Sequence, residues 1–380
     1  MRIGIVAPPW IPVPPPGYGG IESVIDTLAR GLVRAGHEVL LAAPQESTCP
    51  VRTVPGTGSA KGVTMGNTLD ELEHVVRAYA AMADTDIIHD HTLAGPVYRH
   101  RPAGVPVVTT VHSPFAAKVR SLCRAFDADV AIVAISEHQA GTAADIPIAA
   151  VIHHGLAMDG IPVGRGDGGY ACFLGRMHPH KGVTQAIEIA RAGGVPLRIA
   201  AKMQNQQEHE YFNTQIRPRL SSNEEFLGEV GGLEKYELLG GALALINPIQ
   251  WPEPFGMVMI ESLAAGTPVL ATPNGSAPEI VEDAVSGFLR STTMGLVRAL
   301  PDCERLDRTA CRRAVEQNFS ADRMVAAHLA LYTEICAGTA APTVAAAAPE
   351  PINTWRFPDR QMALPGSTVF VDDGGIDAAR

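Results

Sequence analysis

Apolar runs and stretches of helical periodicity alternate along the first part of the chain. An apolar run at 3–6 is followed by apolar side chains at helical spacing from Ile21 to Leu32, and then by a second apolar run at 39–43. A strand, a helix and a strand in this order are typical of a parallel sheet covered by helices. Residues 47–68 lack periodicity and are predicted to form a loop or a short hairpin. Further buried strands are predicted at 86–89, 107–111, 130–134 and 150–153.

The same alternation starts again after a break at 161–169. This stretch is rich in Pro and Gly and has no room for a helix or a buried strand, which indicates a boundary between two domains. The pattern therefore predicts an α/β chain whose two domains are each built on a sheet. Beyond the break, strands are predicted at 170–174, 197–201, 226–227, 242–246 and 268–271, and helices at 183–192, 211–220, 257–265 and 319–336.

Composition and charge narrow the range of functions. The 380 residues are 46% hydrophobic and 18% charged, with a formal net charge of −10, which is globular composition and disfavours nucleic acid as a partner. No apolar stretch reaches the roughly 18 residues of a membrane span, and the first residues lack the features of a secretory signal. The six cysteines form no C-x-x-C pair, so we expect reduced thiols in a cytoplasmic protein.

A glycine-rich turn stands between the first strand and the first helix. Gly17, Gly19 and Gly20 leave backbone amides uncovered at a helix start, where the helix dipole favours an anionic ligand. The spacing differs from the G-x-G-x-x-G motif of dinucleotide-binding proteins, and no acidic residue ends the second strand, which disfavours a dehydrogenase. A tight turn after the proline-rich segment is the alternative interpretation.

Two cations flank a turn that joins a strand to a helix in the second domain. The segment from Gly175 to Gly182 carries Arg176 and Lys181 near the carboxyl end of a predicted strand, the edge at which open α/β sheets bind ligands. Two cations beside a helix N-terminus can hold a diphosphate. Taken singly, each residue could also be a solvated charge in a loop.

Two glutamates frame the start of a later helix. Glu253 lies in a loop in which Gly256 permits a ligand to approach the backbone, and Glu261 lies more than one turn into the helix that follows. The neighbouring helix positions are apolar, and a carboxylate buried among them needs a polar partner. Ribose hydroxyls would provide that partner, whereas stabilisation by the helix dipole fades after the first turn.

These motifs, together with the segment Gly275…Pro278-Glu279, resemble the retaining nucleotide-sugar glycosyltransferases of family four over residues 1–335. The resemblance implies the GT-B fold, in which two Rossmann-like domains face each other across a cleft. It also implies transfer of a sugar from a nucleoside-diphosphate sugar to an acceptor hydroxyl, with retention of the anomeric configuration and without a cofactor.

The same resemblance divides the chain into four parts. Residues 1–160 would form the acceptor-side domain, residues 161–318 the domain that binds the nucleotide sugar, and residues 319–336 a helix that crosses back to the first domain. Residues 337–380 begin with an Ala/Pro/Thr-rich segment and are expected to form a disordered tail. Trp355 within this tail leaves a partner-binding role open.

By resemblance to the family, five charged residues contact the donor. Arg176 and Lys181 would neutralise the diphosphate in place of a metal ion, and Lys202 is a candidate for a third cation. Glu261 would bind the ribose hydroxyls and Glu253 the hydroxyls of the transferred sugar. Preorganised cations would supply the largest catalytic contribution, because negative charge grows on the leaving phosphate.

The resemblance also assigns uncharged contacts. His112 follows a predicted strand and matches a family histidine beside the transferred sugar, although a lone histidine is more often structural. No residue is named as a nucleophile. The phosphates, the sugar and the nucleobase would meet the backbone at Gly19, Gly20, Val230, Phe255, Gly256 and Met257.

No metal site is predicted from the paired histidines. In the segment 89–91 the two histidines share one face of an extended chain while Asp90 points to the other face, and no third ligand follows at a useful spacing. The pairs at 153–154 and 178–180 are interpreted in the same way. Two Asp-x-Asp triplets, at 84–86 and 127–129, precede their strands and so lie at the wrong edge of the sheet for a ligand.

Two other functions stay open. A nucleotide-sugar 2-epimerase shares the fold but normally needs additional acid and base carboxylates, which the sequence does not reveal. A non-catalytic nucleotide-sugar-binding protein is disfavoured because the charged residues of the motifs are intact. The expected partners are a nucleotide sugar and an acceptor whose identity the sequence does not reveal: a saccharide, a small molecule, or a lipid-linked molecule that would bring peripheral membrane contact.

Overall fold

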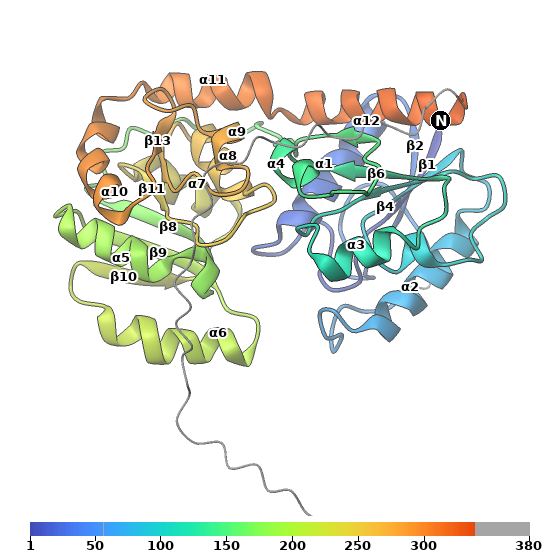
Figure 1. The fold of residues 1–380 in the computed structure, drawn as a ribbon, viewed down its shortest axis with the longest axis horizontal. Coiled ribbons are helices and arrows are strands. Elements are labelled where there is room, and N and C mark those ends of the chain that lie inside the picture. The colour runs from blue at the N-terminus through green and yellow to red at the C-terminus, as the bar shows by residue number, and fades with distance from the viewer. Residues whose placement is uncertain (56, 339–380) are drawn as a thin grey trace, which may run out of the picture. The chain divides into compact units, whose positions relative to one another are not determined.

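The computed structural model describes residues 1–55 and 57–338, which contain two parallel β-sheets and their helices (Figure 1). The first sheet has seven strands in the order β3-β2-β1-β4-β5-β6-β7, and every neighbouring pair is parallel. Its strands are β1 (Arg2–Val6), β2 (Glu38–Ala42), β3 (Arg52–Thr53), β4 (Ile87–Asp90), β5 (Val107–Thr110), β6 (Val130–Ala134) and β7 (Ala150–Val151). Its helices are α1 (Gly20–Arg34), α2 (Thr68–Ala81), α3 (Ala117–Cys123) and α4 (Glu137–Gly141), with a 3-10 turn at Gly95–Val97.

The second sheet has six strands in the order β10-β9-β8-β11-β12-β13, again all parallel. Its strands are β8 (Ala171–Arg176), β9 (Leu197–Lys202), β10 (Glu224–Gly228), β11 (Leu245–Asn247), β12 (Val269–Ala271) and β13 (Gly287–Leu289). The helices in this part of the chain are α5 (Val183–Ala192), α6 (Gln206–Tyr211), α7 (Gly232–Gly241), α8 (Met257–Ala264), α9 (Ala277–Ile280), α10 (Thr293–Ala299), α11 (Arg308–Asn318) and α12 (Ala321–Cys336).

Burial on both faces explains why the strands were visible in the sequence as continuous apolar runs. In β1 the residues from Ile3 to Val6 are fully buried, since the faces of a parallel sheet are covered by helices. Strand β4 differs because it ends with His89 and Asp90, two polar side chains that are also fully buried. These polar groups lie at the carboxyl edge of the sheet, where ligands bind in such folds.

The helix predicted at 319–336 is confirmed as α12, which packs against α1 of the first sheet (Figure 1). A Cβ atom at Gly31 of α1 would lie 2.3 Å from the side chain of Val325, so only glycine allows this close approach. Tyr332 of α12 is fully buried and its hydroxyl lies 2.6 Å from Nδ1 of His89. The side chains of α12 thus belong to the core of the first sheet.

Several predicted elements need correction. The helix predicted at 211–220 is α6, which begins at Gln206 after the capping side chain of Asn205 and continues into a π-helical turn at 212–216 and a 3-10 turn at 217–219. Strand β7 is shorter than predicted, because β6 ends at Ala134 and offers no further partner. The short strand β3 pairs in parallel with β2, which excludes a hairpin there.

The predicted tail falls outside the described residues from position 339 onward. Within residues 1–55 and 57–338, no helix combines the length and the apolar character needed to cross a membrane.

Candidate active site

Two adjoining cavities lie at the carboxyl edges of the two sheets. A small cavity of about 150 Å³ and a large cavity of about 700 Å³ share four lining residues. The shared residues are Tyr18, Gly20, Ile21 and His112. The start of the first helix and the residue after β5 therefore form the boundary between the two spaces.

The small cavity brings together most of the residues predicted from the second sheet's motifs. The predicted residues that line it are Gly20, His112, Lys181, Glu253, Phe255, Gly256 and Met257. Gly19 and Arg176 line the large cavity instead. Three predicted site residues, Lys202, Val230 and Glu261, line neither of these cavities.

Two glycines with positive φ position the loop that carries Glu253. Gly256 has φ of 92° immediately before α8, a conformation that disfavours other residues and leaves the first amides of the helix uncovered. Gly275 has φ of 63°, and a Cβ atom there would lie 2.2 Å from the carbonyl oxygen of Glu253. Ser276 then donates its amide to that carbonyl oxygen at 3.0 Å, so the 275–279 segment positions the Glu253 loop.

Glu253 is engaged by two donors. Its Oε2 accepts a hydrogen bond from Nζ of Lys181 at 2.5 Å and another from Nε1 of Trp251 at 2.9 Å. The Lys181 side chain is 18% exposed and that of Glu253 is 13% exposed, so the pair is largely desolvated. The cation predicted to hold a diphosphate is thus already paired with the carboxylate predicted to hold the sugar.

Arg176 is also paired, with a residue that the sequence interpretation missed. Its Nε donates to Oε1 of Glu208 at 2.9 Å, and the Glu208 side chain is only 1% exposed. Glu208 stands three residues after the N-cap Asn205, whose Oδ1 accepts the amide of Glu208, and its own carboxylate accepts the amide of Gln204, in a variant of the capping box. The N-x-x-E pattern could have revealed a helix start here, but not the ion pair.

Glu261 has a protein partner, which corrects the expectation that it would need a ligand to satisfy its charge. Nζ of Lys235, on α7, donates to Oε1 of Glu261 at 2.6 Å, and both side chains are mostly buried. This pair could not be predicted from the sequence, because α7 was not predicted and its amphipathicity is weak. A ribose would therefore have to bind alongside Lys235.

Lys202 ties the glycine loop to the second sheet. Its Nζ donates to the carbonyl oxygen of Tyr18 at 2.7 Å and lies 3.7 Å from the carboxylate of Glu229. Glu229 in turn accepts the amide of Tyr18 at 2.6 Å, and a Cβ atom at Gly17 would lie 2.2 Å from its Oε1. Gly17 thus serves the close packing of a turn, and Lys202 holds that turn in place.

Val230 is buried in the core that surrounds β8 and α8. Its side chain is therefore not available to a ligand, and the contact of its backbone with a nucleobase stays a prediction.

A row of four histidines lines the first sheet's side of the site. The rings of His89, His91, His112 and His154 follow one another at centroid distances of 4.2, 5.2 and 5.2 Å. Nδ1 of His91 lies 2.9 Å from Nε2 of His112, while Nε2 of His91 and Nδ1 of His112 are buried without a partner. Burial lowers the pKa of His112 to about 3, so its ring is uncharged at neutral pH.

The expected directions of the 89–91 side chains are confirmed. His89 and His91 contact each other, whereas Asp90 accepts a hydrogen bond from the Tyr79 hydroxyl at 2.8 Å on the opposite face. Within residues 1–55 and 57–338, no group of three or more His, Cys, Asp or Glu side chains is arranged to hold a metal ion.

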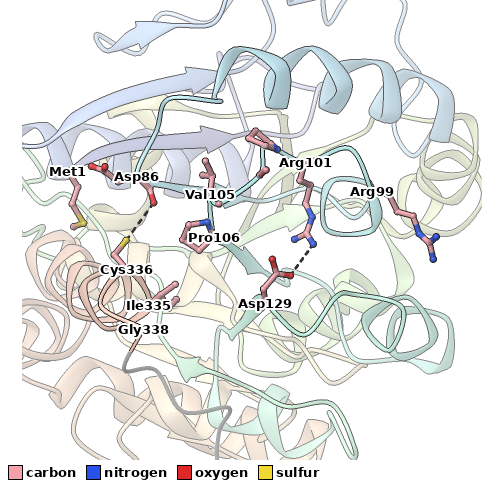
Figure 2. A pocket seen from close by; sticks show the side chains of 13 residues that line it. Met1, Asp86, Arg99, Arg101, Val105, Pro106, Asp129, Ile335, Cys336 and Gly338 are labelled. Carbon is pink, nitrogen blue, oxygen red and sulfur yellow. Dashed lines mark hydrogen bonds and ion pairs between the residues drawn. The ribbon is translucent and has the colours of Figure 1, made fainter.

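The two Asp-x-Asp triplets lie at the opposite, amino edge of the first sheet, as expected. Figure 2 shows Arg101 reaching Asp129 there, and the same guanidinium also contacts Asp127 at 2.6 Å. Asp86 accepts the backbone amide of Arg2. Asp86, Arg101 and Asp129 border a separate cavity of about 840 Å³ beside the end of α12 (Figure 2).

Polar contacts near the small cavity join the two α/β units. Glu279 accepts the amides of Glu137 and His138 at the start of α4, at 2.9 and 2.7 Å, and its Oε2 lies 2.7 Å from Nε2 of His153. The hydroxyl of Ser136 donates to the carbonyl oxygen of Pro254 at 2.6 Å. These bonds fix the Glu253 loop against the first sheet.

Comparison with known proteins places this geometry in context. Residues 18–159 match the family model described as Glycosyltransferase Family 4, and residues 163–306 match the one described as Glycosyl transferases group 1. A phosphatidyl-myo-inositol mannosyltransferase from Mycolicibacterium smegmatis is 27% identical, over 76% of this chain and 80% of its own.

Two solved structures share the architecture. AviGT4, a glycosyltransferase involved in avilamycin A biosynthesis, superposes with a TM-score of 0.68 at 26% identity, over 89% of this chain and 98% of its own. Anabaena Alr3699/HepE in complex with UDP and glucose superposes with a TM-score of 0.68 at 19% identity, over 88% of this chain and 100% of its own. At 19% identity, the likeness to Alr3699/HepE shows a shared fold and nothing more.

Proposed function

Because this chain belongs to glycosyltransferase family four and has the GT-B fold, we propose that it moves a sugar from a nucleoside-diphosphate sugar to an acceptor hydroxyl with retention of the anomeric configuration. The observation that carries the proposal is the junction of the two cavities at His112 and Gly20. A donor in one cavity and an acceptor in the other would meet at that junction. Retention is proposed on the family membership alone.

The donor diphosphate would bind between the small cavity and Arg176. Lys181 and the uncovered amides at the start of α8 supply donors on one side, and Arg176 is 37% exposed, so part of its guanidinium stays accessible beside Glu208. The HepE complex with UDP and glucose supports a uridine nucleotide as the first donor base to test. Glu261 would contact the ribose while still paired with Lys235.

In the proposed reaction the bond between the anomeric carbon and the phosphate oxygen breaks, and its electron pair stays on the nucleoside diphosphate. The acceptor oxygen bonds to the same face of the anomeric carbon, and its proton ends on the departing phosphate. Arg176 and Lys181 stabilise the growing negative charge, which is the role that fixed cations fill best in a desolvated site. His112 lines both cavities and is neutral, so its ring can contact the transferred sugar without adding charge.

Product analysis tests the proposal. The protein is mixed with UDP-, GDP- and ADP-sugars and a broad panel of acceptor alcohols, and products are identified by mass spectrometry and by the anomeric proton coupling in NMR. A glycoside with the donor's anomeric configuration supports it. A glycoside with the opposite configuration would overturn retention, and an epimerised free sugar would favour a 2-epimerase. Nucleotide binding without turnover would favour the non-catalytic alternative.

A further inference from the structure

The large cavity has a largely apolar lining. Trp10 and Ile11 line it from the segment after β1, and Leu72, Leu93 and Val97 line it from α2 and the segment after β4. A volume of about 700 Å³ lies within the range of pockets that enclose a drug-sized molecule. Three of the apolar lining residues are also partly exposed to solvent: Met65, Leu72 and Leu122 are 48%, 37% and 38% exposed.

The charges of this cavity are unfavourable for an anion. Among the described residues that line it, Arg176 is the only Lys or Arg, and its guanidinium is held by Glu208. Two carboxyl groups, Glu22 and Glu71, line the same space, and the histidines that reach it are neutral. An acceptor phosphate would therefore meet two acidic side chains and no uncommitted cation from the described part of the lining.

We propose that the acceptor is an uncharged molecule with a compact apolar body, which the large cavity encloses with one hydroxyl directed at His112. This inference rests on the proposed glycosyl transfer and adds the chemical class of the acceptor. The hydroxyl end is polar because Thr110, His112 and Ser113 line the cavity beside the junction with the donor space. The apolar body lies against Trp10 and Leu72, and burial of its surface supplies affinity.

The charge pattern separates this chain from relatives with phosphate-bearing acceptors. The name of the mannosyltransferase that it resembles specifies a phosphatidyl-myo-inositol, which is an inositol that carries a phosphate. A phosphate beside Glu22 and Glu71 would either meet their negative charges or require both carboxyl groups to stay protonated. Burial raises the pKa of both carboxyl groups, which agrees with a water-poor pocket.

A matched set of acceptors tests the inference once a donor is identified. The neutral phenol 7-hydroxy-4-methylcoumarin is compared with its anionic analogue 7-hydroxycoumarin-4-acetate, with myo-inositol 1-phosphate and with dodecanol. We expect kcat/KM for the neutral coumarin to exceed that of each anion by about tenfold or more. A preference for either anion, or for the long-chain alcohol that represents a lipid acceptor, would overturn the inference.

Matched variants assign the effect to this cavity. Leu72→Ser should raise the KM for the neutral coumarin about fivefold to tenfold, while Leu69→Ser, one turn earlier and 76% exposed outside the cavity, should leave it unchanged. Glu71→Gln should narrow the preference for the neutral acceptor, whereas Glu73→Gln should not. Equal effects in each pair would contradict the proposal. If no donor sugar is cleaved with any acceptor or with water, the proposed glycosyl transfer itself fails, and this inference fails with it.

Discussion

The two sides of the candidate active site solve the problem of burying polar groups in different ways. On the second sheet's side, Arg176, Lys181 and Lys235 are each neutralised by a carboxylate within hydrogen-bonding distance. On the first sheet's side, burial keeps the histidines uncharged. The difference teaches that the positive charge for a leaving phosphate can come from the second sheet's side alone. The histidines of the first sheet's side can then contact an uncharged sugar and acceptor.

Removing Arg176 should have the largest effect on this division. The diphosphate is bound throughout the reaction and gains charge on departure, so Arg176→Ala should raise the donor KM and lower kcat, with a loss in kcat/KM of about 10²–10³-fold. Steady-state kinetics with the identified donor measures both parameters.

Arg191→Ala is the matched control for stability. Arg191 also pairs with a glutamate that is 1% exposed, Glu224, but it lines neither cavity of the site. Both variants should lower the midpoint of unfolding, and Arg191→Ala alone should keep normal kinetics. Normal kinetics for Arg176→Ala would remove it from the active site.

The two glutamates on the second sheet's side should differ in kind. Glu253 lines the small cavity next to the reacting sugar, so Glu253→Gln should mainly lower kcat. Glu261 should contact the ribose, which is bound equally before and during the reaction, so Glu261→Gln should mainly raise the donor KM. Each loss should correspond to about 1–3 kcal/mol, the range for hydrogen bonds to charged groups.

If Glu253→Gln changed only the donor KM and Glu261→Gln removed turnover, the assignment of the two carboxylates would be reversed.

Glu22 is a buried carboxyl group on the first sheet's side, so its titration measures the cost of a charge there. Burial raises the pKa of its carboxyl group to about 7, whereas the unfolded chain has the ordinary value of 4.5. The folded protein thus holds the proton more tightly, and stability falls as pH rises from about 4.5 to about 7. Glu22→Gln removes this loss, and we expect a gain in unfolding free energy of about 1–3 kcal/mol at pH 8 and little change at pH 4.

Denaturant unfolding at the two pH values measures that gain, with the exposed Glu73→Gln as control. The same gain at both pH values would show that the carboxyl of Glu22 titrates normally.

The smallest expected effect is that of a chelator. If Arg176 and Lys181 compensate the charge of the diphosphate, EDTA should not change the rate of transfer. Activity that is lost with EDTA and restored by Mg²⁺ or Mn²⁺ would show that the second sheet's side needs a further cation.

The sequence predicted elements whose signal is local. Strands such as β1 and β6 appear as apolar runs because both faces are covered, and α5 was located at its bounds from its periodicity. The start of α6 was missed because its signal is a capping residue and a π-helical turn follows it. Helices α7, α10 and α11, and strand β13, were not predicted.

The site was predictable only as far as its motifs reach. Lys181, Glu253 and His112 meet in one cavity, as the motifs suggested. The partners Glu208 and Lys235 lie 32 and 26 residues from the groups that they neutralise, so only the packing of helices onto the sheet reveals them. A motif therefore identifies the charged residues of the site but not the partners that neutralise them, because those partners are neighbours in space and not in sequence.

The position of α12 has a consequence for how the chain is made. Met324, Val325, Leu331 and Tyr332 belong to the same core as Ile3 and Ile5, although they are synthesised last among the described elements. At about 5–20 residues per second, a ribosome needs on the order of ten to thirty seconds to extend the chain from residue 160 to residue 336. During that interval the nascent first sheet exposes the apolar face that α12 will cover. Ribosome-arrested chains that end before residue 320 should accordingly be cut by protease within the first 160 residues, and chains that extend well beyond residue 336 should resist.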